Sequence, residues 1–262
     1  MKNNVSLTLS GGGIRSAASI GVIKYLEENN INIEALSGSS GGSIISFLYG
    51  LTGNINIVEQ FIKEFNILDI FDIKNFDFIS LKNLEKRLIE FSNKKQFKKQ
   101  VIVCTTDLKT GKSIYFDSNK VSKQTMIEAV IASSSLQPLF RPKKIGKYLL
   151  IDGGYTDNLP NIVFENRYNI SVNVNNVDKK SDISFSNIVK RILLIVMNSN
   201  IRESAKKADV FINVDTLHNV NILSFSKIDM AIKEGYKIAK KTIEKNKKEK
   251  FKVVFYEESK WI

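Results

Sequence analysis

Apolar and polar positions over the first fifty residues follow a strand–turn–helix pattern that occurs twice. Val5–Ser10 alternates apolar and polar residues and then meets three glycines, which predicts a strand followed by a turn. Over Ile14–Asn29, apolar residues recur at helical spacing with small residues beside them, which predicts a closely packed helix. A short strand at Ile33–Ser37 and an apolar helix at Gly41–Leu51 repeat the order. This alternation is typical of a parallel sheet covered by helices.

Later elements are spaced less regularly. The pattern predicts helices at Ile55–Phe65, Leu81–Phe91, Val121–Ser133, Phe185–Ser199 and Ile228–Asn246. It predicts strands at Val101–Thr106, Ser113–Phe116, Tyr148–Ile151, Val210–Asn213 and Lys252–Tyr256. The turn Asp107–Gly111 joins the first two of these strands as a hairpin. Because no internal repeat or low-complexity linker interrupts the chain, we expect one domain over residues 1–262.

The segment Asn66–Ser80 is rich in aspartate and phenylalanine and joins two of the predicted helices. Two interpretations of Phe71, Phe76 and Phe78 stay open. These rings either cover the entrance to a site or pack into the core, and core packing is at least as common a role for phenylalanine.

Composition is that of a globular protein, with 43% hydrophobic and 25% charged residues. The single cysteine, Cys104, cannot form an internal disulfide, which fits a reducing compartment. The first residues carry no signal-peptide core, and the longest purely apolar run, Ile192–Met197, is far shorter than the ~20 residues that span a bilayer. We therefore expect a cytoplasmic protein.

The formal charge of +12 fits two kinds of partner, or none. It fits nucleic acid, an anionic lipid surface, or simply a lysine-rich solvated surface. No basic-and-aromatic module typical of nucleic-acid binding is present, so we expect no nucleic acid partner. A peripheral contact with anionic membrane stays open, because the last helix carries Lys233, Lys237, Lys240, Lys241 and Lys245.

The segment GSSGG at Gly38–Gly42 fits the pattern G-x-S-x-G, in which a sharp strand-to-helix turn exposes a serine hydroxyl. Ser40 is the middle residue, and Gly38 and Gly42 remove side chains that would clash at the turn. Ser39 and Ser43 are rival hydroxyls, but only Ser40 has glycine two residues away on both sides. Ser40 is therefore the predicted nucleophile.

A serine nucleophile needs a base, and two residues qualify. His218 is the only histidine, so a Ser–His–Asp triad would have to use it. Asp152 is the stronger candidate, because it ends a predicted strand and Gly153 and Gly154 let the backbone turn close by. An ordinary turn aspartate is the structural alternative for Asp152, since Asp-Gly is a common turn dipeptide.

The predicted oxyanion donors are the backbone N–H groups of Gly11, Gly12 and Gly13, which precede a helix. Arg15 either braces this loop, meets a phosphate headgroup or forms a surface salt bridge. The loop also approximates a dinucleotide fingerprint, with Glu34 near the position of a ribose-binding acid. That reading leaves the serine and the aspartate unexplained.

Cofactors are not expected. One histidine and one cysteine offer no zinc constellation, and the sequence contains neither a calcium loop nor a P-loop for ATP.

The ordered set of motifs resembles the patatin-like phospholipases, serine–aspartate lipid acyl hydrolases, from Val5 to about Pro160. The matching segments are GGGIRS, GSSGG, TTDL with TG, ASS leading to PLF, and DGGYTDNLP, whose Asn158 and Pro160 help to shape the aspartate loop. The resemblance implies a three-layer α/β/α fold with a central, mainly parallel sheet, related to the α/β-hydrolases. One departure is Ser16, where the family commonly has glycine.

The resemblance further implies a Ser40–Asp152 dyad, with Gly11–Gly13 as the oxyanion loop and Arg15, Gly38, Gly42, Gly153 and Gly154 as supporting residues. The implied substrate is a phospholipid or another acyl-ester lipid, cleaved through an acyl-enzyme. The alternative from another class is a catalytically silent lipid- or membrane-binding module with the same fold. Retention of both the serine and the aspartate argues against that alternative.

Overall fold

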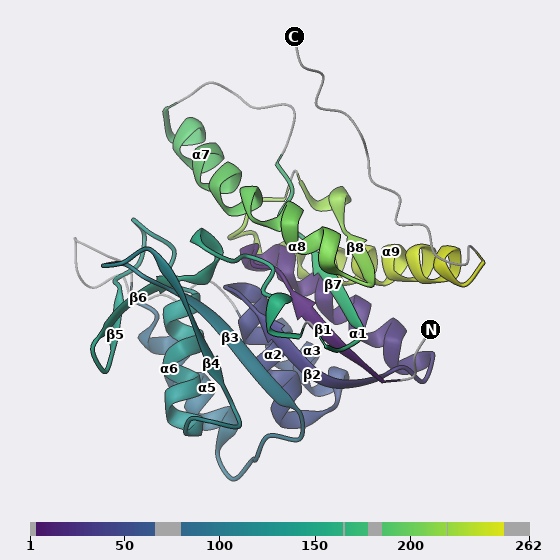
Figure 1. The fold of residues 1–262 in the computed structure, drawn as a ribbon, viewed down its shortest axis with the longest axis horizontal. Helices are drawn as coiled ribbons and strands as arrows, with labels where there is room; N and C mark the ends of the chain where they lie inside the picture. Colours follow the sequence, from purple (N-terminus) through teal and green to yellow (C-terminus); the bar gives the residue numbers. More distant parts are fainter. Residues whose placement is uncertain (1–3, 66–79, 165, 178–184, 219, 249–262) are drawn as a thin grey trace.

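One mixed sheet organises the chain (Figure 1). The computed structural model describes residues 4–65, 80–164, 166–177, 185–218 and 220–248, and within them the sheet has eight strands. Their bounds are β1 Asn4–Leu9, β2 Asn32–Gly38, β3 Gln100–Asp107, β4 Lys112–Asp117, β5 Lys143–Ile145, β6 Tyr148–Asp152, β7 Asn169–Asn173 and β8 Val210–Asn213. The order is β5-β6-β3-β2-β1-β7-β8, with β4 paired to β3. Strands β3, β2, β1, β7 and β8 are mutually parallel, whereas β4, β5 and β6 add antiparallel pairings.

Helices flank this sheet. Their bounds are α1 Ala18–Glu28, α2 Gly41–Thr52, α3 Ile55–Lys63, α5 Lys82–Ser92, α6 Lys123–Ser133, α7 Phe185–Ser199, α8 Ile201–Lys207 and α9 Ile228–Lys248. Helices α1 and α9 pack closely because each has a glycine at the contact. A Cβ on Gly21 would lie 2.6 Å from the Tyr236 nitrogen, and one on Gly235 would lie 2.6 Å from the Ala18 carbonyl carbon. Figure 1 shows α7 projecting from the rest of the molecule. The α/β class expected from the sequence is confirmed.

The two faces of the central strands differ in polarity. Leu7 and Leu9 of β1 point into the hydrophobic core with Ile170 and Val172 of β7. On the opposite face the side chains are polar but equally buried. Asn169 Nδ2 there donates to Ser6 Oγ and Thr8 Oγ1, each at 3.0 Å. Buried polar groups are tolerated when they are hydrogen-bonded to one another, as they are here.

Strand β7 was missed by the sequence pattern, and the polar face explains why. Its residues alternate between apolar and hydrogen-bonding side chains, so the segment resembles an exposed loop although all five of its residues are buried. The short edge strand β5 and the helix α8 were also not predicted. The first turn of the predicted helix at 14–29 is a 3₁₀ helix, Gly13–Ala17. The 66–79 part of the phenylalanine-rich segment and the strand predicted at Lys252–Tyr256 lie outside the described residues.

Pairing along β3 brings the ends of two distant strands together. β4 pairs with Ile102–Asp107 and so occupies one edge of β3. β2 pairs with Gln100–Val103 and β6 with Thr105–Asp107, so these two strands must share the other edge. β2 runs parallel to β3 and β6 antiparallel, and their carboxyl ends therefore point toward one another. The residues that follow β2 and those that end β6 meet at this point.

None of the helices in the described ranges combines the length and the apolar character needed to cross a bilayer.

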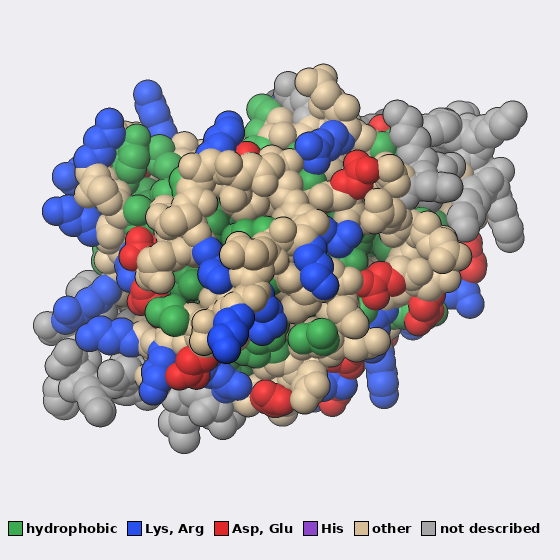
Figure 2. All heavy atoms as spheres, turned by 90° about the horizontal axis from the view of Figure 1, so that it is seen from below, with side chains coloured by type: hydrophobic (Ala, Val, Ile, Leu, Met, Phe, Trp, Pro, Cys, Tyr) green, Lys and Arg blue, Asp and Glu red, His purple; other side chains and the backbone are tan. Residues whose placement is uncertain are grey.

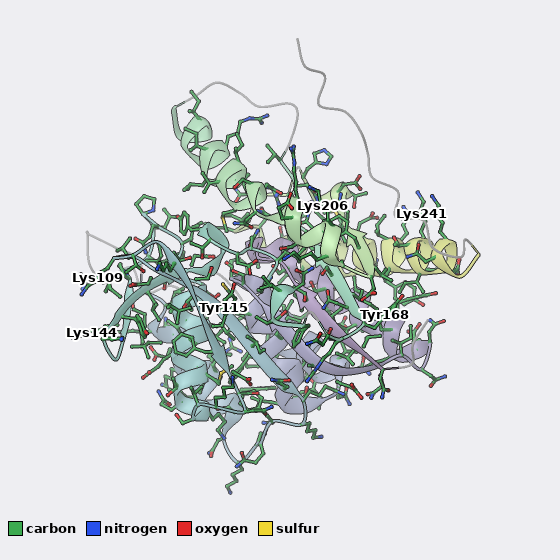
Figure 3. The ribbon with its side chains drawn as sticks, viewed as in Figure 1. Lys109, Tyr115, Lys144, Tyr168, Lys206 and Lys241 are labelled. Atoms are coloured by element: carbon green, nitrogen blue, oxygen red, sulfur yellow. The ribbon has the colours of Figure 1, made fainter. Side chains whose placement is uncertain are left out.

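Lysine and arginine side chains are distributed over separate parts of the surface. Lys109 and Lys144 lie on one side of the molecule and Lys241 on the other (Figure 3). On the face seen in Figure 2, basic side chains stand among acidic ones rather than in one stripe. The lysines of α9 named above are exposed, while the apolar side of this helix packs on α1. This distribution matches a solvated basic surface, and membrane contact through α9 stays a prediction.

Candidate active site

Ser40 occupies a sharp turn between β2 and α2. Its backbone has φ 51° and ψ −129°, a conformation that is unfavourable for a residue with a side chain. The turn is tightly packed, because a Cβ on Gly38 would lie 2.6 Å from the carbonyl of Gly42, and one on Gly42 would lie 2.6 Å from Ser10 O. Only glycine fits at either position without a backbone shift.

The rival hydroxyls face away from the site. Ser43 Oγ donates to Ser40 O at 2.6 Å, and Ser39 is fully buried with its Oγ against Gly153. Ser40 alone of the three lines the cavity described below.

A hydroxyl on α6 holds the Ser40 backbone. The Ser40 N–H donates to Ser133 Oγ at 2.8 Å, and the Ser133 hydroxyl donates to Cys104 O of β3 at 2.6 Å. Ser133 therefore connects the turn to the sheet through two buried hydrogen bonds. The sequence pattern predicts Ser133 at the end of a helix but does not indicate this role.

Removal of this bridge is expected to weaken both fold and site. In Ser133→Ala, the Ser40 N–H and the Cys104 carbonyl lose their partners inside the protein, which should lower the free energy of unfolding by about 1–3 kcal/mol. Denaturant unfolding measures the loss. Ser135→Ala is the matched control, because the buried Ser135 hydroxyl, just beyond α6, donates to Ile131 O of that helix and makes no hydrogen bond to Ser40 or β3 among the described residues. Equal stabilities of the two variants would contradict the bridging role.

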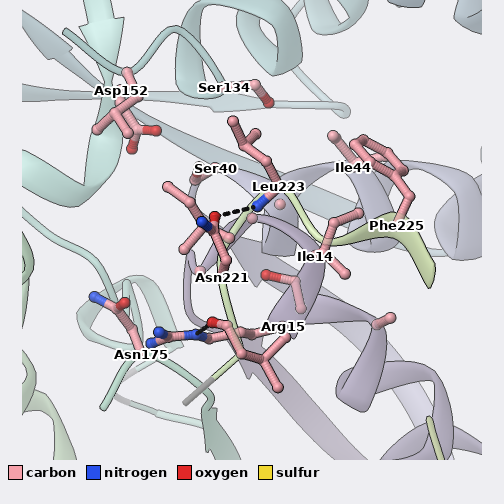
Figure 4. A pocket seen from close by; sticks show the side chains of 18 of the residues that line it. Ile14, Arg15, Ser40, Ile44, Ser134, Asp152, Asn175, Asn221, Leu223 and Phe225 are labelled. Carbon is pink, nitrogen blue, oxygen red and sulfur yellow. Dashed lines mark hydrogen bonds between the residues drawn. The ribbon is translucent and has the colours of Figure 1, made fainter. Parts of the chain in front are cut away.

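Asp152 ends β6 and is completely buried. Its Oδ1 accepts a 2.8 Å hydrogen bond from the Gly154 N–H, while Oδ2 has no hydrogen-bond partner among the described residues. Burial raises the pKa of Asp152 from 3.8 to about 7, and the Gly154 amide and the nearby Ser40 hydroxyl oppose part of this rise. Ser40 and Asp152 line the same pocket (Figure 4), and among the described residues nothing donates a hydrogen bond to Asp152 Oδ2. A carboxyl with this pKa can accept a proton at neutral pH.

Glycines 153 and 154 allow this placement. A Cβ on Gly153 would lie 2.7 Å from Ser39 Oγ, and one on Gly154 would lie 2.9 Å from Asn158 Oδ1 and 3.1 Å from Asp152 Oδ1. The backbone after Asp152 therefore packs so closely on its neighbours, Ser39 among them, that positions 153 and 154 have no space for a side chain.

The glycine loop after β1 differs from the expectation at one residue. The Gly11 N–H already donates to Asn158 Oδ1 at 3.0 Å and to Asn158 O at 3.3 Å, so it is not available to an oxyanion. The amides of Gly12 and Gly13 make no hydrogen bond to another described residue, and both glycines line the cavity. Gly13 also has φ 56°, which favours glycine. The predicted donor set is thereby reduced to Gly12 and Gly13, with Gly11 fixing the loop.

Arg15 is a buried brace, with only 4% of its surface exposed. Its Nε donates to Val220 O at 2.7 Å, and its terminal nitrogens donate to Asn176 O at 3.0 Å and His218 O at 2.9 Å. These bonds fasten the glycine loop to two loops from the last third of the chain. The arginine was predicted from sequence, but its partners were not.

A cavity of about 470 Å³ opens at Ser40. Apolar side chains dominate its lining, among them Ile14, Ile44, Phe65, Leu81, Leu84, Leu136, Phe140, Leu193, Leu194, Met197, Leu223 and Phe225. Figure 4 shows polar groups of Ser134 and Asn175 on the wall near Ser40 and Asp152. Its lining from α7 and from residues 218–228 was not found from sequence, since amphipathic periodicity shows that a helix has an apolar side but not which surface that side covers.

The alternative chemistries fit less well. His218 lines the cavity, but its Nδ1 contacts Asp215 O at 2.6 Å, and within the described ranges no hydrogen bond joins it to Ser40 or Asp152. Glu34 is exposed near the start of β2, far along the strand from the glycine loop, so it cannot serve the ribose of a dinucleotide there. Among the described residues, no group of three metal-binding side chains is present.

Comparison with known proteins shows the family of the chain. A family model for patatin-like phospholipase matches residues 7–164, more than half of the chain. The chain is 33% identical over 181 residues to a patatin-like phospholipase domain-containing protein of Caenorhabditis elegans, covering 63% of this chain and 13% of that protein. It is 27% identical over 203 residues to the lysophospholipase NTE1 of Debaryomyces hansenii, covering 70% and 12%. The chain thus spans about an eighth of the length of these relatives.

Among solved structures, VipD from Legionella pneumophila aligns with a TM-score of 0.61 at 13% identity, over 92% of this chain and 66% of that one. At this identity the match shows a shared fold only.

Proposed function

Because the chain belongs to the patatin-like phospholipase family, we propose that it hydrolyses fatty-acyl esters of phospholipids or related lipids through Ser40 and Asp152. The observation that carries the proposal is the buried Asp152 carboxyl beside the strained Ser40 turn, whose pKa is raised to about 7 and whose Oδ2 has no hydrogen-bond partner in the described part of the chain. A buried carboxylate oxygen without a hydrogen bond is unfavourable in a merely structural role.

In the proposed reaction, Asp152 Oδ2 takes the Ser40 proton as Oγ attacks the ester carbonyl. Negative charge then forms on the carbonyl oxygen, where the amides of Gly12 and Gly13, which bond to no other described residue, can stabilise it. The C–O bond to the alcohol breaks, and the alcohol leaves with the proton from Asp152. A water then gives a proton to Asp152 and attacks the acyl carbon. The bond to Ser40 Oγ breaks, Oγ takes the proton back from Asp152, and the fatty acid leaves.

The cavity supports an acyl substrate. Its lining is mostly apolar, as an alkyl chain requires, and Ser40, Ser134 and Asp152 are among its polar residues. An acyl chain in this cavity would present its ester to the serine. Hydrolysis of a panel of phospholipids and lysophospholipids would define the preferred headgroup and the acyl position that is cleaved.

Labelling with a fluorescent fluorophosphonate tests the nucleophile. We expect the wild type to be labelled, Ser40→Ala to show none and Asp152→Asn to be labelled far more slowly, because the phosphonate requires an activated serine. Circular dichroism establishes that each variant is folded. Absent labelling of the folded wild type, or undiminished labelling of Ser40→Ala, would overturn the proposed chemistry in favour of a silent lipid-binding module.

A further inference from the structure

Helix α7 has two apolar faces, and one of them lines the cavity. Leu193, Leu194 and Met197 all contribute to the cavity wall that contains Ser40. At 3.6 residues per turn, these three residues lie on one side of the helix. This side accounts for only part of the apolar residues of α7.

The other apolar face is open to solvent. Ile188, Ile192, Ile195 and Val196 are 40%, 54%, 50% and 40% exposed. Their spacing places them within an arc of about 100°, opposite the three cavity residues. Ile192 and Ile195 are among the most exposed large hydrophobic side chains of the described residues. A contiguous apolar stripe of this kind usually marks an interaction surface.

Position and charge indicate a lipid surface as the partner. α7 projects from the body of the protein (Figure 1), and its inner face already lines a cavity suited to acyl chains. Its sequence contains Lys190 and Arg191 but no acidic residue, and the whole chain has a formal charge of +12. Helices that lie in a membrane interface combine an apolar face with basic residues.

We propose that the outer face of α7, defined by Ile188, Ile192, Ile195 and Val196, inserts into the surface of an anionic phospholipid bilayer. The choice of lipid as partner rests on the proposed function. Insertion of this face places a single helix between the bilayer and the cavity. An acyl chain then passes from the membrane to Ser40 alongside α7 without crossing water.

Flotation with vesicles of phosphatidylcholine and phosphatidylglycerol tests this surface in the Ser40→Ala protein, where no hydrolysis alters the lipid. We expect Ile192→Asp with Ile195→Asp to weaken vesicle binding by at least about tenfold, because two apolar side chains are removed from the interface. Ile57→Asp with Ile89→Asp is the matched control, since both of these residues are 43% exposed on other helices, α3 and α5. The control variant should bind vesicles as tightly as the Ser40→Ala protein without further substitutions.

The surface assignment is overturned if the Ser40→Ala protein fails to bind vesicles, or if the α7 and control variants lose binding equally. It is also overturned if light scattering finds a dimer of the Ser40→Ala protein that the α7 substitutions dissociate. In the last case a second copy of the chain covers the helix. Loss of binding on charge reversal of the α9 lysines alone, with the α7 variant unaffected, would likewise assign docking to α9.

A second readout separates this surface from the catalytic proposal. With Ser40 restored, the α7 variant should cleave a soluble short-chain ester at the wild-type rate but hydrolyse vesicle lipid at least about tenfold more slowly, since Ile192 and Ile195 do not line the cavity. If the wild type is not labelled by fluorophosphonate while vesicle binding still requires α7, the proposed reaction fails and the surface stands. If the α7 variant hydrolyses the soluble ester and the vesicle lipid with equal slowing, the proposed membrane surface is wrong.

Discussion

The Asp152→Asn variant is expected to hydrolyse esters roughly 10²–10⁴-fold more slowly than the wild type, the usual contribution of a positioned general base. The amide keeps the size of the side chain, and its oxygen can still accept from the Gly154 N–H, but it cannot take a proton from Ser40. In the wild type, kcat/KM should rise with pH around the Asp152 pKa of about 7 and level off above it, because only the ionised carboxylate acts as a base. A pH profile on a soluble ester measures both effects.

The same substitution is expected to stabilise the fold at high pH. The pKa of Asp152 is about 7 in the folded protein against 3.8 for an ordinary aspartate, so the folded state binds this proton more tightly. The wild type therefore loses stability as the pH rises between these values, by up to about 4 kcal/mol above pH 7. The neutral amide avoids this loss. The stability advantage of Asp152→Asn should widen from about pH 4 and level off above about pH 7.

Asp157→Asn is the matched control for the activity measurement. Asp157 is also buried in this loop, but its carboxylate accepts from the Tyr115 hydroxyl at 2.8 Å and does not line the cavity. Its activity should stay near that of the wild type. A rate for Asp152→Asn equal to that of Asp157→Asn would remove Asp152 from the proposed mechanism and leave it a structural turn residue.

Ser40→Gly is expected to combine the loss of activity with a gain in stability. Removal of the nucleophile should lower kcat by roughly 10⁴-fold or more. Glycine should also relieve the strained backbone at φ 51°, which disfavours a residue with a Cβ by about 1–3 kcal/mol. Single-turnover kinetics and denaturant unfolding measure the two changes.

Ser40→Ala separates the two effects, because alanine removes the hydroxyl but keeps the Cβ and so the strain. It should be as inactive as Ser40→Gly but no more stable than the wild type. A glycine variant less stable than the alanine variant would show that the turn is not strained in the protein. Residual ester hydrolysis at the wild-type rate in either variant would exclude Ser40 as the nucleophile.

Much of this site is visible in the sequence because its chemistry depends on short local segments. A sharp turn needs small residues beside it, so Gly38 and Gly42 indicate the turn at Ser40 independently of the rest of the sequence. The glycines after β1 and those after Asp152 are local in the same way. The resemblance to patatin-like phospholipases, which the family match confirms, rests on the order of these segments along the chain.

Other features depend on contacts between residues far apart in the sequence. Both oxygens that accept a hydrogen bond from the Gly11 N–H belong to Asn158. The carbonyl groups that bind the Arg15 side chain belong to Asn176, His218 and Val220. Strand β7 was missed because its buried polar side chains satisfy one another across the sheet, which no pattern along a single strand reveals.

By itself, the sequence determined the α/β class, most of the helices and strands, and the identities of the predicted nucleophile and base, because backbone turns and hydrophobic periodicity are local properties. Tertiary structure alone decided that β2 and β6 end at one edge of β3, that burial moves the pKa of Asp152 toward neutrality, and that one face of α7 lines the cavity while the other meets solvent. Strand pairing, desolvation and exposure are set by segments distant in the chain, so they exist only once the chain has folded.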